Sequence, residues 1–174
     1  MSDPRDTVAG MTAVDETMSA INDAVTLGRQ GDTATAREQL TALWDTIGAG
    51  GDPLHRVSLA HFLADLEEHA ADALTWDIRA LDAADSLTDE RAQAHHAGLN
   101  VAGFYPSLHL NLADDYRRLG AFDTAARHLA AARARLDTLD EDGYGLGVRA
   151  GIANVEAALT ERSTEQLPTH PGMS

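Results

Sequence analysis

The chain has 174 residues, of which 44% are hydrophobic and only 5% aromatic, and it contains no cysteine. This is enough apolar material for one domain with a core, and it excludes disulfides, thiolate catalysis and cysteine metal ligands. The net charge of −15, with all 13 basic residues being arginine, opposes binding to nucleic acid or to an anionic membrane, because phosphate contacts drive that affinity.

The start of the chain, MSDPRDTVAG, is polar and lacks the apolar stretch of a secretory signal. No apolar run approaches the roughly 20 residues that span a bilayer. On the absence of a signal alone, we expect a cytoplasmic protein. Residues 1–10 are predicted to be a flexible tail ahead of one domain of residues 11–162, in which abundant alanine and leucine favour packed helices over sheets.

The first helical hairpin is predicted over about residues 17–50. Apolar residues recur at helical spacing from Val14 to Val25. Gly31 suits the end of that helix, and Asp32 suits the N-cap of the next one. The glycines of residues 48–51 then end the second helix.

The second hairpin is predicted over about residues 54–87. Asp52 and Pro53 favour a helix start, because aspartate caps exposed amides and proline fits the first turn. Thr88 can cap an inserted helix over about residues 88–105. Pro106 either kinks a long helix or separates two helices.

Residues 106–139 have the strongest pattern, with large and small residues alternating at the positions of two packed helices: Leu112, Ala113, Tyr116, Leu119, Gly120, Ala125, Leu129 and Ala132. Small residues let antiparallel helices approach closely, while the leucines and the tyrosine fill the seam. This pattern resembles one tetratricopeptide (TPR) repeat of 34 residues. It departs from the family at His109, where tryptophan is usual, and at Asp137, where proline is usual.

The earlier hairpins keep a compatible period, although Asp77 falls where an aromatic residue is expected. Either the register slips there or Asp77 is exposed. A lone capping helix is predicted over about residues 141–162, followed by a disordered tail of residues 163–174. The resemblance implies an all-α fold of helix-turn-helix repeats stacked as a short α-solenoid, a TPR-like superhelix of about seven helices. A generic helical bundle is the alternative.

In that family the concave surface is formed by the first helix of each hairpin. Carried over by position, this places Met18, Ile21 and Val25 on that surface, and it implies a partner-binding groove formed by His55, Ser58, Phe62, Asp65, Ser107, Leu110, Asp114 and Arg117. The resemblance thus implies a non-catalytic adaptor or scaffold that binds a protein or peptide segment. The chain has no lysine for the carboxylate clamp of chaperone-binding members, so we do not expect chaperone-tail binding.

Arg117 has two interpretations. It can pair with Asp114 one turn away in the same helix, or it can face a carboxylate of the partner as a charged anchor. The segment around it, residues 106–139, has 5 Arg and 4 Asp, a net +1 in an acidic chain. The second interpretation implies a partner with an acidic segment.

The remaining sequence patterns give only weak support for a metal site or a phosphate site. His61, Asp65 and His69 could present metal ligands on one helix face, but their spacing spreads them over about 12 Å, which favours an ordinary polar face. The glycines of residues 143–147 follow acidic residues that would repel a phosphate. We expect no catalytic residues, no metal and no cofactor.

Two other functions stay open. A small-molecule pocket could lie under the insertion, lined by His95, His96, Phe104 and Tyr105. Alternatively, the groove could bind another copy of the chain, giving a homo-oligomer.

Overall fold

The computed structural model describes residues 15–168. Within that range the chain forms eight α-helices, two short 3-10 helices and no strand, which confirms the all-α prediction with one helix more than expected. The α-helices are α1 Glu16–Arg29, α2 Thr33–Ile47, α3 Pro53–Asp65, α4 Ala70–Ala84, α5 Asp89–His95, α6 Tyr105–Arg118, α7 Phe122–Arg133 and α8 Gly143–Thr160. The 3-10 helices are η1 Val101–Phe104 and η2 Leu136–Thr138. The predicted tail of residues 1–10 lies outside the described range.

Polar side chains cap the helices where the sequence predicts. Asp32 accepts a hydrogen bond from the amide of Thr35 at the start of α2. Asp52 accepts from two amides at the start of α3, and Thr88 accepts from the amide of Arg91 in α5. Each such cap contributes about 1 kcal/mol. Gly31 and Gly120, which close the first and third hairpins, have φ values of 99° and 77°, a region that glycine adopts without steric cost.

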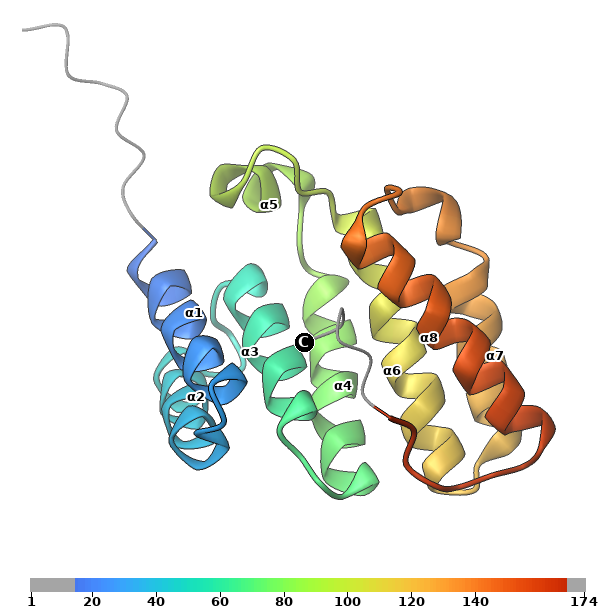
Figure 1. The fold of residues 1–174 in the computed structure, drawn as a ribbon. Helices are drawn as coiled ribbons and strands as arrows, with labels where there is room; N and C mark the ends of the chain where they lie inside the picture. Colours follow the sequence, from blue (N-terminus) through green and yellow to red (C-terminus); the bar gives the residue numbers. More distant parts are fainter. Residues whose placement is uncertain (1–14, 169–174) are drawn as a thin grey trace, which may run out of the picture.

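Three helical hairpins pack side by side in chain order (Figure 1). They are α1 with α2, α3 with α4, and α6 with α7. Helices α1 and α2 both contact α3, α4 contacts α6, and α8 packs on α6 and α7. The seam between α6 and α7 contains Ala113, Ala125 and Ala132, all fully buried, so the small residues occupy the close approach that the sequence predicts.

The apolar core has two parts. One cluster joins α1, α2, α3 and α4 and extends to Leu108 in α6. The other joins α6, α7 and α8. The α6 helix thus contributes to both clusters and connects the two halves of the fold.

The inserted helix predicted over residues 88–105 is interrupted. Helix α5 ends at His95, and residues 96–100 form a loop before η1. Asn100 accepts a hydrogen bond from the amide of Gly103, and Asp89 accepts from the amide of Val101, so side chains replace the helical bonds there. Pro106 lies in the first turn of α6, where a proline needs no amide partner.

Two further features differ from the sequence analysis. Asp77 is buried, with 3% of its surface exposed, which excludes a surface position for it. Residues 163–168, named here the C-terminal segment, lie in the tail predicted to be disordered; they have no regular secondary structure, but Leu167 packs against the second apolar cluster. Residues 169–174 lie outside the described range.

Candidate functional site

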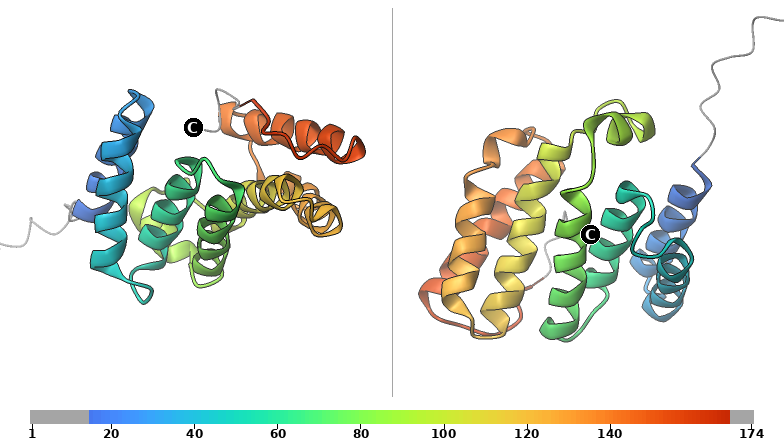
Figure 2. Two further views of the ribbon diagram at one scale, coloured as in Figure 1. Left: turned by 90° about the horizontal axis from the view of Figure 1, so that it is seen from below. Right: turned by 180° about the vertical axis from the view of Figure 1, so that it is seen from behind.

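A hollow, named here the central cleft, is lined by residues of α1, α2, α3, α4, α6 and α8. Its volume is about 620 Å³, and residues 166–168 form part of its wall. The left view of Figure 2 shows α1 at one end of the row of hairpins and α8 lying across α6 and α7 towards the other end. Apolar side chains such as Val25, Phe62, Leu110 and Leu167 line it. The volume falls within the range of known ligand sites, about 300–1,000 Å³. Such sites also have mostly apolar linings.

Carboxyl groups gather in the central cleft. Asp77 from α4 and Asp115 from α6 are 3% and 4% exposed, and Asp65 at the end of α3 also lines the cleft. The side-chain amide of Asn111 donates to Asp77 Oδ1 at 3.3 Å and lies 3.4 Å from His61 Nδ1. The cleft therefore combines apolar walls with a small group of buried polar side chains.

Burial changes the acidity of these carboxyl groups. Burial, together with the charge of Asp115, raises the pKa of Asp77 well above its usual range. Burial also raises the pKa of Asp115 to about 7. Burial also raises the pKa of Asp65, against the opposing charges of His61 and Arg29, although 39% of its side chain is exposed. Asp77 and Asp115 are neighbours, so the two carboxyl groups titrate as a coupled pair.

The C-terminal segment is held by Arg117, which is fully buried. Its guanidinium donates to Asp114 Oδ1 at 2.9 and 2.6 Å. It also donates to the carbonyl oxygens of Ser163 at 2.6 Å and Glu165 at 2.8 Å. The pairing of Arg117 with Asp114 is present, and the guanidinium faces the chain itself instead of solvent, so it is not placed to meet a partner's carboxylate.

A second cavity of about 410 Å³ lies beneath the loop that follows α5. Both lining sets include Arg29 and Phe62, so the two hollows are adjacent. At its wall the Tyr144 hydroxyl donates to Ser107 Oγ at 2.7 Å, and Ser107 Oγ donates to the carbonyl of Phe104 at 3.0 Å.

Only part of the small-molecule pocket expected from the sequence forms. Phe104 lines the second cavity, but His95 and His96 are exposed and lie outside it. The hydroxyl of Tyr105 donates to Asp85 at 2.8 Å, away from the cavity.

The structure distributes the predicted groove residues over three places. Those in the central cleft are Phe62, Asp65, Leu110 and Asp114. Those in the second cavity are Ser58, Phe62 and Ser107. Those outside both are His55 and Arg117. On α1, Val25 lines the central cleft, whereas Met18 and Ile21 are buried in the core.

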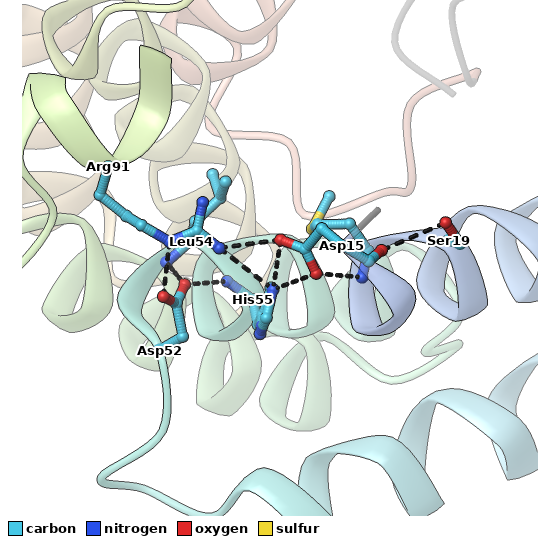
Figure 3. A network of polar contacts seen from close by, with 7 residues as sticks. Asp15, Ser19, Asp52, Leu54, His55 and Arg91 are labelled. Atoms are coloured by element: carbon cyan, nitrogen blue, oxygen red, sulfur yellow. Dashed lines mark hydrogen bonds and ion pairs between the residues drawn. The ribbon is translucent and has the colours of Figure 1, made fainter. Parts of the chain in front are cut away.

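His55 belongs to a polar network at the start of α1 and α3 (Figure 3). His55 Nε2 lies 2.8 Å from Asp15 Oδ1. Arg91 from α5 donates to Asp15 at 2.9 Å and to Asp52 at 2.6 Å. Burial opposes ionisation of Asp15, but hydrogen bonds from the Met18 amide, His55 and Arg91 outweigh it and lower its pKa to about 2. The network joins three helices, so we assign it to stability.

Asp77, Asn111 and Asp115 were not predicted as site residues. Asn111 and Asp115 are four positions apart on α6 and therefore share a face, and Asp77 had already been singled out as a departure from the repeat pattern. These two signals could have suggested a polar site. The pairing of α4 with α6 that brings the three together is not visible in the sequence.

The metal pattern around His61 does not form a site. His61 Nε2 is 3.9 Å from Asp65, but α3 ends at Asp65 and His69 lies at the N-cap of α4. Among residues 15–168 no group of three or more His, Asp or Glu side chains could hold a metal ion. In the same range no helix is long and apolar enough to cross a membrane.

Comparison with known proteins adds no relative. No family model, no curated protein and no solved structure matches this chain.

Proposed function

We propose that this protein is a non-catalytic adaptor or scaffold whose central cleft binds a non-helical segment of a partner protein. The observation that carries the proposal is the chain's own C-terminal segment, which lies at the cleft without regular secondary structure. Leu167 supplies its apolar contact, and the carbonyls of Ser163 and Glu165 supply its main-chain contacts. Apolar anchors combined with main-chain hydrogen bonds are the usual basis of peptide recognition.

The arrangement of the helices supports this proposal. Each hairpin contacts the next in chain order, and α8 packs on the last hairpin, as a terminal helix does in a stacked array. We propose that the three hairpins and α8 form a short TPR-like solenoid. The first helices of the three hairpins, α1, α3 and α6, would form its concave side. All three contribute residues to the central cleft.

Binding can be tested with a fluorescein-labelled peptide of residues 161–170 added to the full-length protein, followed by fluorescence anisotropy. In the wild type the attached segment competes with the peptide, because its effective concentration is high. Leu167→Ser removes the apolar anchor of the attached segment. We expect this variant to bind the peptide about tenfold more tightly than the wild type does.

Two control variants make the result specific. Glu165→Ala keeps the carbonyl that Arg117 uses and alters only an exposed side chain, so it should bind like the wild type. Val25→Trp puts a larger side chain in the wall of the central cleft and should weaken binding, with an unchanged circular dichroism spectrum. If no variant binds the peptide, or if Leu167→Ser and Val25→Trp both behave like the wild type, the proposal is wrong.

A second candidate function is the binding of a small molecule. The central cleft keeps about 620 Å³ of volume with the C-terminal segment in place, which favours this candidate. A metabolite that binds there would raise the melting temperature in proportion to the logarithm of its concentration. Thermal shift screening, repeated on Val25→Trp, would separate cleft binding from surface binding.

A further inference from the structure

The lining of the central cleft is unevenly charged. Its arginines are Arg29 and Arg118, whereas its carboxyl side chains are Asp65, Glu67, Asp77, Asp114 and Asp115. Two of these carboxylates have a cationic partner outside the cleft lining. Asp114 accepts from Arg117, and Glu67 lies 3.5 Å from Arg37. The remaining ones, Asp65, Asp77 and Asp115, form an acidic group that we name the cleft carboxylates.

Asp115 is the least compensated member of the cleft carboxylates. Its Oδ2 is buried, and no hydrogen-bond partner for it is found among the described residues. Its Oδ1 lies 4.0 Å from Arg118 Nη1, the outer limit of an ion pair. The other terminal nitrogen of Arg118 donates to the carbonyl of Glu68 at 2.9 Å. A proton shared between Asp77 and Asp115 can bond one oxygen of Asp115, and within residues 15–168 neither carboxyl group has a cationic partner closer than Arg118.

Uncompensated charge of this kind is costly in an interior unless a counter-charge arrives. On the basis of the proposed peptide-binding function, we propose that the central cleft receives a lysine or arginine side chain of the bound segment, and that the cleft carboxylates Asp65, Asp77 and Asp115 pair with its charge. The partner is therefore a basic segment.

The walls of the cleft fit such a side chain. Val25, Phe62 and Leu110 offer apolar surface to the aliphatic stem that lysine and arginine carry beneath their charge. The net charge of −15 also attracts a basic partner from a distance. Arg117, which could have favoured an acidic partner, has its donors occupied by Asp114 and the C-terminal segment.

The test is a set of peptides based on residues 161–170. In each peptide one position carries lysine, norleucine or glutamate. Norleucine keeps an aliphatic stem close to that of lysine and lacks the charge, so the comparison isolates the ion pair. Binding is measured by anisotropy to the full-length Leu167→Ser protein at low and at high salt.

We expect one position at which the lysine peptide binds about tenfold more tightly than the norleucine peptide, as a charge-assisted contact would give. The glutamate peptide should be the weakest at the same position. Salt should reduce the preference for lysine, because it screens the pairing at the partly exposed Asp65.

Charge-neutral variants locate the effect. Asp65→Asn and Asp115→Asn, each made in the Leu167→Ser protein, should abolish the preference for lysine over norleucine. Glu38→Gln changes the net charge equally on an exposed position of α2 outside the cleft lining, so it should keep the preference. Asp65 is partly exposed and tolerates neutralisation even if Asp115→Asn unfolds the protein.

The outcomes separate this inference from the proposed function. If the norleucine peptides bind and no position prefers lysine, the basic-partner inference is wrong and the peptide function stands. If Glu38→Gln reduces the preference for lysine as much as Asp65→Asn does, the preference reflects net charge and not the cleft carboxylates. If no peptide of the set binds, the proposed function itself fails.

Discussion

The guanidinium of Arg117 donates to the carbonyl oxygen of Glu165, 48 positions further along the chain, at 2.8 Å. This bond fixes the C-terminal segment to α6. Because Arg117 is fully buried, its charge depends on Asp114 and on the two carbonyls of that segment.

Removing this contact should release the segment. In Arg117→Met the carbonyls of Ser163 and Glu165 lose their donor, and Asp114 loses its partner. We expect a destabilisation of about 3 kcal/mol, the usual result of breaking a buried pair. Hydrogen exchange followed by mass spectrometry should show faster exchange in residues 163–168.

The neighbouring Arg118→Met is the matched control. Arg118 bonds to the carbonyl of Glu68 and not to the C-terminal segment. It should leave exchange in residues 163–168 unchanged. Equal exchange of those residues in wild type and Arg117→Met would remove Arg117 as the contact that holds the segment.

Asp115 should make the protein less stable as the pH rises. Its pKa is raised to about 7 in the folded state, so the folded state binds more protons than the unfolded state between about pH 4 and 7. The free energy of unfolding therefore falls across that range. Asp77, Asp65, Asp114 and Arg118 face or adjoin this carboxyl group and shift the same titration.

Asp115→Asn removes the titrating charge with little change of shape. We expect the variant to be more stable than the wild type at pH 8 by about 2 kcal/mol, or roughly 5 °C in melting temperature. The difference should shrink at pH 5. A variant that is equally destabilised at both pH values would show that the carboxylate stabilises the fold.

The contribution of Asp15 to stability changes with pH in the opposite direction. Its pKa is lowered to about 2 in the folded state, so its contribution is present above about pH 4 and is lost as the pH falls towards 2. Asp15→Asn keeps an oxygen that can cap α1 but removes the charge that His55 and Arg91 contact. Since Asp15 is partly exposed, we expect a loss of about 1 kcal/mol at pH 6.

Urea unfolding at pH 6 and pH 2.5 tests this assignment. The gap between wild type and Asp15→Asn should narrow markedly at pH 2.5, because that pH lies below the pKa of the unfolded-state carboxyl group and approaches the folded-state value of about 2. Asp23→Asn, an exposed change on the same helix, serves as the control. A gap of constant size would mean that the network contributes through its shape and not through its charge.

The seam between α6 and α7 should not accept a larger side chain. Ala125 is fully buried there, so Ala125→Leu should destabilise the protein by roughly 1–3 kcal/mol through overpacking. The adjacent Ala126 is exposed, and Ala126→Leu should change stability by no more than about 0.5 kcal/mol. Thermal unfolding of the two variants side by side measures the difference. Similar melting temperatures would contradict the assigned packing.

Local chemistry explains which parts of the fold were predictable. The caps Asp32, Asp52 and Thr88 act on amides two or three residues away, and Gly31 and Gly120 close turns through their own backbone angles. Each of these interactions involves only residues that are close together in the sequence. The three hairpins therefore followed from the sequence.

The candidate site depends on contacts between distant residues. Asp77 and Asp115 gain their altered acidity from the packing of α4 against α6, which neither local sequence specifies. Likewise, residues 163–168 are polar apart from Leu167 and Pro168, so composition indicated disorder. Leu167 and the two carbonyls bound by Arg117 hold that segment in place.

The most direct measurement of the central claim is a titration of the isotope-labelled Leu167→Ser protein with the unlabelled peptide of residues 161–170, read in ¹⁵N–¹H correlation spectra. Binding in the central cleft predicts that the amide signals of Val25, Phe62, Asn111 and Gly151 shift together with one dissociation constant. Shifts confined to helices α5 and α7, which contribute no residue to the cleft lining, or no shifts at millimolar peptide, would contradict a peptide-binding role for the cleft.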